Sequence, residues 1–164
     1  MGLFLKYFKN LALIMLIGKS LANVTISVGD VSVSGYTEDI VVPVTLSNPE
    51  NIVGGFQFDV IVLPTLIELS GVSAVDADNF SADYNIFDDG SGRIVFYSGN
   101  GSGIAQGGDD VVMNLHYDGS EILSANLDLD LFDLTVSDEN GNIIEGDLEN
   151  GSITIGDVVI LSAT

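Results

Sequence analysis

The sequence contains no cysteine, no tryptophan and a single histidine, and only four of its 164 residues are lysine or arginine. The absence of cysteine excludes disulfides, thiolate zinc sites and cysteine nucleophiles. Three of the four basic residues, Lys6, Lys9 and Lys19, lie in the first 22 positions, which leaves Arg93 as the only base downstream. Schiff-base chemistry and P-loop phosphate binding both need a lysine, so both are excluded from the rest of the chain.

The acidic residues have the opposite distribution. All 24 Asp and Glu residues lie in 23–164, where a single base opposes them and the formal charge is −23. A nucleic-acid-binding domain needs a basic surface, and adsorption to an anionic membrane needs basic clusters, so this part of the chain fits neither class. The classes that remain are a binding module, a calcium-binding protein, and a hydrolase that works with carboxylates alone.

Residues 1–22 have the pattern of a secretory signal peptide. Two lysines precede a short apolar stretch at 11–17, and the small residues Ser20 and Ala22 stand at positions −3 and −1 of a cleavage site. The apolar stretch is too short to cross a bilayer comfortably. We expect the mature protein to be extracellular, with no membrane insertion after cleavage. The alternative is an uncleaved amphipathic anchor.

Downstream of residue 22, the pattern predicts β-strands throughout. Short runs of Val, Ile, Leu, Phe and Thr are bounded by Gly, Asn and Asp, and no stretch has convincing helical periodicity. The regular spacing is typical of a sandwich or jelly roll, so we expect one all-β domain over 23–156 and a short tail over 157–164. The nine expected strands span residues 24–34, 40–47, 54–63, 67–75, 81–87, 92–98, 110–117, 125–136 and 151–155.

Local patterns within these strands predict which side chains face the core and where the chain turns. Apolar residues occupy every second position over 56–62, which places Gln57 and Asp59 on the outside. Pro43 lies within an expected strand, which predicts an edge position or a bulge. The Asn-Gly step within 138–142 predicts a tight hairpin.

The long strand at 125–136 changes its alternation part of the way along. Leucines alternate with aspartates over 127–131, but Leu134 and Val136 follow the other parity. One extra residue near Phe132 and Asp133 would restore the phase, because each strand position points to the opposite face from its neighbours. We therefore predict a β-bulge there.

The ordered set of strands and turns resembles the cohesin module, the receptor domain of cellulosome scaffolds. The resemblance covers nearly all of residues 23–156 and depends on the order of several segments rather than on any single one. These segments are residues 39–48 with their proline, 53–60, 93–97, 109–112, 138–143 and 150–156.

The resemblance implies a nine-stranded jelly-roll β-sandwich related to carbohydrate-binding modules. It also implies secreted, non-catalytic docking of a calcium-loaded dockerin-type partner, in polysaccharide-degrading or cell-surface assemblies. In the family, one flat sheet face supplies the contacts. On this sequence, the implied partner-binding residues are Gln57 and Asp59 on the third strand, Tyr97 on the sixth, and Asn100 and Gly103 in the loop after it.

Asp128 and Asp130 extend this face if the long strand lies beside the third strand, as in cohesins. With Asp59 they would form an acidic docking face for a basic or cation-bearing partner. The alternative is an ordinary polar surface. Ile61, Leu63 and Val95 share the outward parity, and apolar residues beside acids on a flat face favour an interface.

Calcium is the metal that this composition favours, because carboxylate, carbonyl and amide oxygens bind it. Loop clusters with such oxygens occur at 76–79, 88–89, 109–110 and 138–140, and none has the spacing of an EF-hand loop. We expect no resident cofactor and no metal site in the chain's binding face. Calcium would be carried by the partner or by these acidic loops, and simple solvation of the loops is the alternative.

Catalysis is not expected. His116 is the only histidine that could serve a Ser-His-Asp triad, and its outward strand position favours an ordinary solvated surface residue. With 24 acids, chance alone places some carboxylate pair at glycosidase spacing. The alternatives to protein recognition are polysaccharide binding on the same sheet and a calcium-dependent structural or surface protein. The lack of tryptophan counts against polysaccharide binding, with Tyr97 the one aromatic placed on that face.

Overall fold

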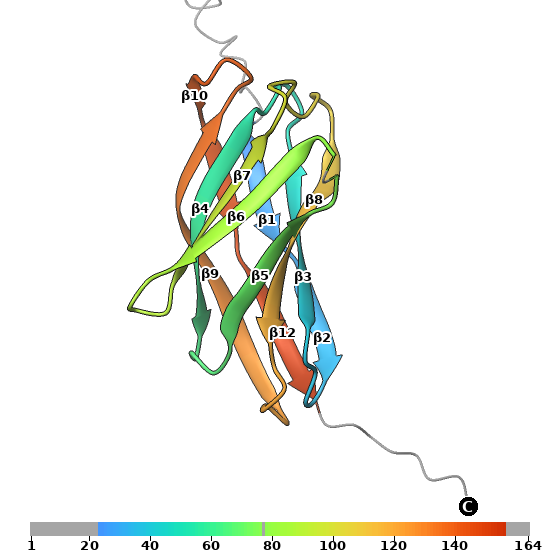
Figure 1. Cartoon of the computed structure of the whole chain (residues 1–164), viewed down its shortest axis with the longest axis vertical. Coiled ribbons are helices and arrows are strands. Elements are labelled where there is room, and N and C mark those ends of the chain that lie inside the picture. The colour runs from blue at the N-terminus through green and yellow to red at the C-terminus, as the bar shows by residue number, and fades with distance from the viewer. Residues whose placement is uncertain (1–22, 77, 157–164) are drawn as a thin grey trace, which may run out of the picture.

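The structure is a computed structural model that describes residues 23–76 and 78–156. These residues form an elongated β-sandwich whose strands run roughly along its long axis (Figure 1). The described ranges contain twelve strands and no helix, and therefore no helix that could cross a membrane. The expected signal peptide at 1–22 and the expected tail at 157–164 lie outside the described residues.

The first sheet has five strands in the order β11-β1-β3-β8-β5. Its strands are antiparallel except for β1 and β11, which run parallel. The members are β1 (Val24–Val28), β3 (Ile40–Ser47), β5 (Glu68–Ala74), β8 (Asp109–Asp118) and β11 (Gly146–Glu149).

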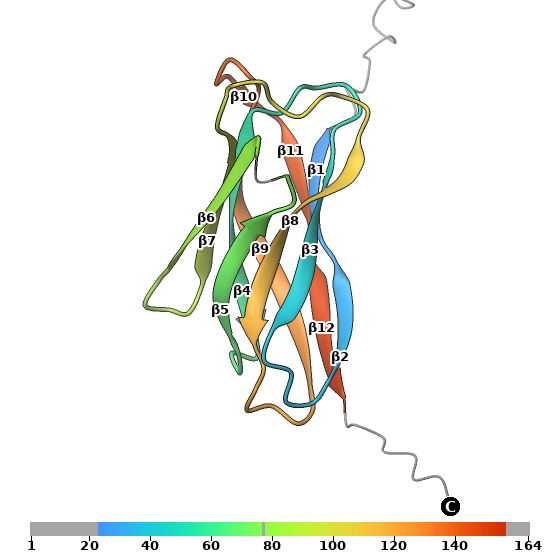
Figure 2. The ribbon, with the colours of Figure 1, turned by 45° about the vertical axis from the view of Figure 1, so that its right-hand side comes forward.

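The second sheet has the order β2-β12-β9-β4-β7-β6, and the short β10 pairs with β9. Figure 2 shows the two layers, with β6 and β7 in one and β5, β8 and β3 in the other. The members are β2 (Asp30–Ser34), β4 (Gly55–Leu63), β6 (Phe80–Ile86), β7 (Gly92–Ser98), β9 (Ala125–Ser137), β10 (Ile143–Ile144) and β12 (Gly151–Gly156).

Nine strands were expected and twelve are found, because one expected strand is divided and two short strands were not expected. The expected strand at 24–34 is divided at Gly29, so that β1 pairs with β3 while β2 pairs with β12. The unexpected strands are β10 and β11, and the chain changes sheets again between β11 and β12. A side chain on Gly151 would collide with the carbonyl oxygen of Val28, so glycine allows the two crossing segments to approach.

The core lies between the two sheets and consists mainly of the inward side chains that the alternation predicts. On β8 the odd positions from Met113 to Tyr117 face in as predicted, but Val111 is exposed and Val112 buried, because the register shifts between Val111 and Met113. Phe58, Ile94 and Leu115 are fully buried, and β1 alternates buried and half-buried positions along its length. Phe96 stacks on Phe56 with ring centroids 5.0 Å apart and on Phe80 at 5.3 Å. Burial of these side chains supplies the main driving force for folding. No disulfide adds to it, because the sequence has no cysteine.

The bulge predicted near Phe132 and Asp133 is confirmed. Gln57 of β4 pairs with Thr135 of β9, but Asp59 pairs with Phe132, so β9 has one more residue than β4 in this interval. Asp133 has a φ of 54°, a left-handed conformation that one class of β-bulge uses. Side chains on either side of the bulge therefore face the core with opposite parity.

Two further local predictions have different outcomes. Pro43 is not at a sheet edge, because β3 lies between β1 and β8. A register shift occurs one residue on, between Val44 and Thr45, but its extra residue, Val112, belongs to β8 and not to the strand of the proline. The hairpin predicted at 138–142 is confirmed. Its backbone closes with Asp138 N donating to the oxygen of Asn142 at 2.9 Å.

Candidate docking face

The outward side of β9, β4, β7 and β6 is here called the outer face. β9 lies directly beside β4, so the condition set for Asp128 and Asp130 to share this face is met. The register places the outward residues in rows across the sheet: Ser137, Gly55 and Tyr97; Thr135, Gln57 and Val95; Phe132, Asp59 and Arg93; Asp130 and Ile61; Asp128 and Leu63.

A shallow hollow of ≈ 190 Å³ occupies the outer face where β4 begins. Gly55 forms its floor, because a residue with no side chain stands there between Ser137 and Tyr97. Tyr97 is 47% exposed beside it, and Gln57 lines it from the next row. The structure thus brings together two of the predicted partner-binding residues at one concave point.

Asp59 lies on the outer face as predicted, but its charge is already paired. The Asp59 side chain is 5% exposed, and its carboxylate accepts hydrogen bonds from Arg93 Nε at 2.7 Å and from Arg93 Nη2 at 2.8 Å. This hydrogen bonding and the nearby negative charge raise the pKa of Arg93. Asp59 therefore holds the guanidinium in place and does not offer a free acid to a partner. Sequence analysis did not pair the two residues, since 34 positions separate them.

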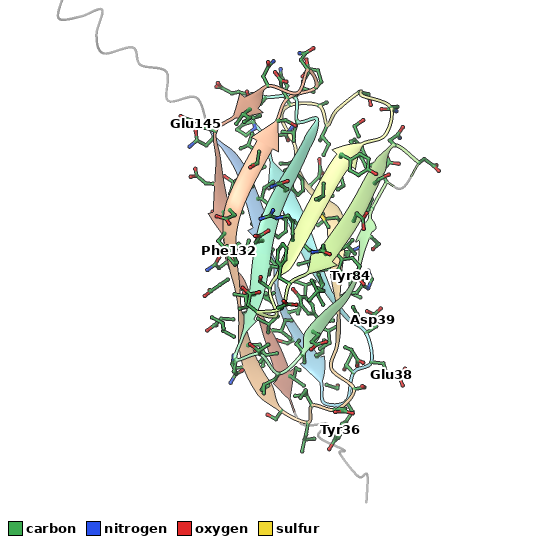
Figure 3. All side chains as sticks on the ribbon, turned by 60° about the vertical axis from the view of Figure 1, so that its left-hand side comes forward. Tyr36, Glu38, Asp39, Tyr84, Phe132 and Glu145 are labelled. Atoms are coloured by element: carbon green, nitrogen blue, oxygen red, sulfur yellow. The ribbon has the colours of Figure 1, made fainter. Side chains whose placement is uncertain are left out.

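Phe132 is an outward aromatic that sequence analysis assigned only to the bulge. Phe132 is on β9, directly opposite Asp59 of β4, and is 38% exposed. Figure 3 shows it on this face. On the β7 side, Arg93 stacks over Phe87, with its guanidinium carbon 5.4 Å from the ring centroid. The middle of the outer face thus presents an arginine between two partly exposed aromatic rings, a composition enriched at protein interfaces.

Asn100 and Gly103 shape the loop that borders the hollow at the end of β7. The Asn100 side-chain oxygen accepts hydrogen bonds from Ser98 Oγ at 2.9 Å and Ser102 Oγ at 2.6 Å, and its amide donates to Asn79 at 3.1 Å. Gly103 has a φ of 63°, which favours glycine. Both residues order the loop through internal contacts and backbone conformation.

Asp128 and Asp130 lie at the opposite end of the outer face from Tyr97. Asp128 is exposed and faces Leu63 across the strand pair, while Asp130 accepts a hydrogen bond from Asn150 Nδ2 at 2.9 Å. The seven predicted residues therefore form no single cluster: Gln57, Tyr97, Asn100 and Gly103 are at one end, Asp59 is in the middle, and Asp128 and Asp130 are at the other end.

His116 lies on the other sheet and is not the free, solvated histidine that was expected. Its side chain is 26% exposed, with Nδ1 2.9 Å from Asp39 Oδ1 and Nε2 2.9 Å from Ser73 Oγ. The order of these contacts is that of a Ser-His-Asp triad. However, the orienting acid of a triad is buried, whereas the Asp39 side chain is 60% exposed. Sequence analysis missed both partners because they come from distant strands and loops.

No group of three or more Asp, Glu or His side chains within residues 23–76 and 78–156 is arranged to hold a metal ion. The fold and the outer face together define an all-β binding module: a sandwich with a nearly flat face that carries aromatic, apolar and acidic side chains in one surface. Comparison with known proteins gives the family. The model of the Cohesin domain matches residues 24–155, and the chain belongs to the cohesin family.

Solved structures agree with this assignment, whereas no curated protein matches. A non-cellulosomal cohesin from the archaeon Archaeoglobus fulgidus has a TM-score of 0.64 and 22% identity, covering 82% of this chain and 91% of that one. CaCohA2 from Clostridium acetobutylicum, in complex with a variant of CaDoc0917, has a TM-score of 0.64 and 27% identity over 81% and 99%. The sixth cohesin of Acetivibrio cellulolyticus scaffoldin B, in complex with a Cel5 dockerin mutant, has a TM-score of 0.65 and 21% identity, covering 82% of this chain and 99% of that one.

These findings establish the jelly-roll β-sandwich and the family that the sequence resemblance implied. Cohesin domains are non-catalytic binding modules, so family membership also agrees with the expectation that the chain is no enzyme.

Proposed function

We propose that this chain is a secreted cohesin module that binds a dockerin-type protein through the outer face of its second sheet. The observation that carries the proposal is the hollow at Gly55, beside which Tyr97 stands half-exposed. Family membership supports the kind of partner, since several of the similar solved structures are complexes of a cohesin with a dockerin.

The outer face contains the residue types that form binding hot spots, with polar residues around them. Tyrosine and arginine are enriched among residues whose truncation weakens protein complexes most. Here Tyr97 and Arg93 occupy neighbouring parts of β7, and Phe132 lies on the far side of Asp59. The ion pair with Asp59 fixes Arg93 before binding, which lowers the entropy lost when a partner contacts it. We place the centre of the interface between Tyr97 and Phe132.

The charge of the domain defines the chemistry of a suitable partner. A formal charge of −23 over residues 23–164 favours a partner with a basic surface and increases the rate of association at low salt. Asp128 is exposed at one end of the outer face and would meet such a surface. A dockerin that carries bound calcium supplies positive charge of this kind.

Secretion is part of the proposal and depends on residues 1–22. The lysine-containing start, the apolar stretch and Ser20-Leu21-Ala22 together favour cleavage after residue 22. Expression of the full gene in a secreting host, followed by mass measurement of the exported protein, tests this. A mature N-terminus at Asn23 is expected, and an exported or membrane-held chain that still begins at Met1 would contradict it.

The binding partner is tested by capture. The chain is immobilised and exposed to secreted proteins of its source, once with calcium and once with a chelator, and retained proteins are identified by mass spectrometry. Retention of dockerin-bearing proteins, lost from a Tyr97→Ala column but kept on a Tyr36→Ala column, is expected. Tyr36 is a suitable control because it is 57% exposed at the far end of the sandwich (Figure 3).

The same columns distinguish protein docking from polysaccharide binding. Aromatic side chains on a flat sheet also stack against sugar rings, so sugar binding has to be tested too. A parallel glycan array measures it directly. Tyr97-dependent glycan binding with no retained protein would replace the dockerin proposal by a carbohydrate-binding role. Retained dockerins with a silent array would assign the chain to an assembly, and the catalytic domains attached to those dockerins would show whether polysaccharide is its target.

A further inference from the structure

The side chain of Asn48 is buried, and its amide oxygen lies near Asp110 at the start of β8. Asn48 is 0% exposed, and its Nδ2 lies within hydrogen-bond distance of the carbonyl oxygens of Asn51 (3.0 Å), Ala105 (2.9 Å) and Ile104 (3.3 Å). These three acceptors fix the orientation of the amide, because the opposite orientation would set oxygen against oxygen. Oδ1 is therefore buried with no hydrogen-bond partner among the described residues.

The space that borders this oxygen is kept open by Gly108. A methyl group built on Gly108 would lie 3.2 Å from Asn48 Oδ1 and 2.8 Å from Asp110 Oδ2. Two acceptor oxygens, one of them charged, thus border the same small space, and neither can donate a proton to the other. This space between Asn48, Gly108 and Asp110 is here called the Gly108 notch.

A cation is the ligand that this pair of oxygens fits. A buried acceptor with no donor is unfavourable, and a neighbouring carboxylate makes it more so. Calcium is bound by amide and carboxylate oxygens in irregular geometry and completes its shell with water. We propose that the Gly108 notch binds a calcium ion, with Asn48 Oδ1 and the Asp110 carboxylate as protein ligands and water as the remainder. Asp110 is exposed, which gives the ion a path from solvent.

The acidic turns elsewhere differ from the Gly108 notch, because their carboxylates accept hydrogen bonds from residues of the same turn. Only at the Gly108 notch does a carboxylate border a buried amide oxygen that has no partner among the residues that the structure describes. The turn contacts are Asp138 with Asn140 and Asn142, Asp89 with Ser91, and Asp76 with Asn79.

One carboxylate and one amide make a weak site. Extracellular calcium modules with few charged ligands have dissociation constants of about 10⁻⁴–10⁻³ M. A site of this strength would be half-filled at sub-millimolar to millimolar calcium. Binding to the folded state alone would then raise the melting temperature by about 3–11 °C in 10 mM calcium.

Thermal melts of the purified chain in 0–10 mM CaCl₂, with KCl at matched ionic strength as the reference, test the proposal. The Gly108→Ala variant fills the notch without removing a ligand, and Gly99→Ala is its matched control, since its nearest neighbour lies 3.9 Å away. Neither glycine has a positive φ, so alanine fits both backbones. The wild type and Gly99→Ala should show the shift, whereas Gly108→Ala and Asp110→Asn should change by less than about 1 °C.

A wild-type chain whose melting temperature is the same in CaCl₂ and in KCl would overturn the proposal, and water would then be the partner of Asn48. An equal calcium response from Gly108→Ala and the wild type would overturn it as well, because the bound ion would lie elsewhere. Asp88→Asn removes an exposed acid far from the notch and should keep the full response. The melts use no partner, so their outcome is independent of dockerin binding, in which the partner's own calcium takes part.

Discussion

Arg93 donates two hydrogen bonds, at 2.7 Å and 2.8 Å, to the buried carboxylate of Asp59 across the β4–β7 strand pair. The only basic residue in 23–164 is therefore committed to one of the 24 acids. The pair lies in the middle of the outer face, so the same contact stabilises the sheet and orients a candidate interface residue.

Replacement of Arg93 by glutamine should destabilise the domain. The variant leaves the Asp59 carboxylate buried without its counter-ion, which costs about 2–3 kcal/mol. We expect less than for a fully enclosed pair, because the arginine side chain is 38% exposed. Urea unfolding of Arg93→Gln measures the loss. The double variant with Asp59→Asn should recover part of it, and a double variant no more stable than Arg93→Gln would contradict the account.

Removal of the Tyr117 hydroxyl should not destabilise the domain. Tyr117 is fully buried, and its hydroxyl has no partner within residues 23–76 and 78–156. Burial also raises the pKa of this phenol well above its usual range, so the group stays neutral. Tyr117→Phe deletes an unpaired polar group and should be neutral or stabilising by about 1 kcal/mol. A loss above about 1 kcal/mol in chemical unfolding would show that the hydroxyl has a partner, for example a buried water.

The turn at 138–142 should make the domain less stable in acid. Hydrogen bonds from Asn142, and from the backbone of Asn140 and Gly141, lower the pKa of Asp138 below its ordinary value of 3.8. A carboxyl with a lowered folded-state pKa contributes stability above its unfolded-state pKa and loses it as the pH falls through the folded-state value. Asp138→Asn should therefore cost more stability at pH 7 than at pH 3. Equal costs in urea unfolding at the two pH values would contradict this.

The Ser73–His116–Asp39 chain should be structural rather than catalytic. The Asp39 side chain is largely exposed, and the chain belongs to a family of binding modules. We expect hydrolysis of a nitrophenyl ester by the wild type to match that of Ser73→Ala under the same conditions. Turnover by the wild type that disappears in both Ser73→Ala and His116→Ala would contradict this expectation. Both variants should remain folded, because the substitutions lie on the outer side of β5 and β8.

Most of the fold could be predicted from local sequence patterns. Alternation along 125–136 located the bulge at Asp133, because a single added residue is the simplest way to reverse strand parity. The division at Gly29 was not predicted, although apolar residues occupy even positions over 24–28 and odd positions at Val31 and Val33; β1 and β2 also pair with different strands. Residue patterns record which way a side chain faces but not which sheet a strand joins.

The candidate site was less accessible to sequence reasoning, because its features depend on register between distant strands. Asp59 was correctly placed outside, yet its ion pair requires β4 and β7 to align residue by residue. Phe132 continues the outward parity of Asp128 and Asp130, but sequence analysis assigned it only to the bulge that follows it. Asn48 carried no recognisable signal, since its unpaired oxygen exists only when three loop carbonyls surround its nitrogen.

The central claim, that the outer face binds a dockerin-type partner, is tested most directly by titration calorimetry with a dockerin identified by capture. Tyr97→Ala and Phe132→Ala should each weaken the affinity at least about 10-fold, while Tyr36→Ala should leave it unchanged. Wild-type affinity in both outer-face variants would contradict the claim and move the interface to another surface of the sandwich.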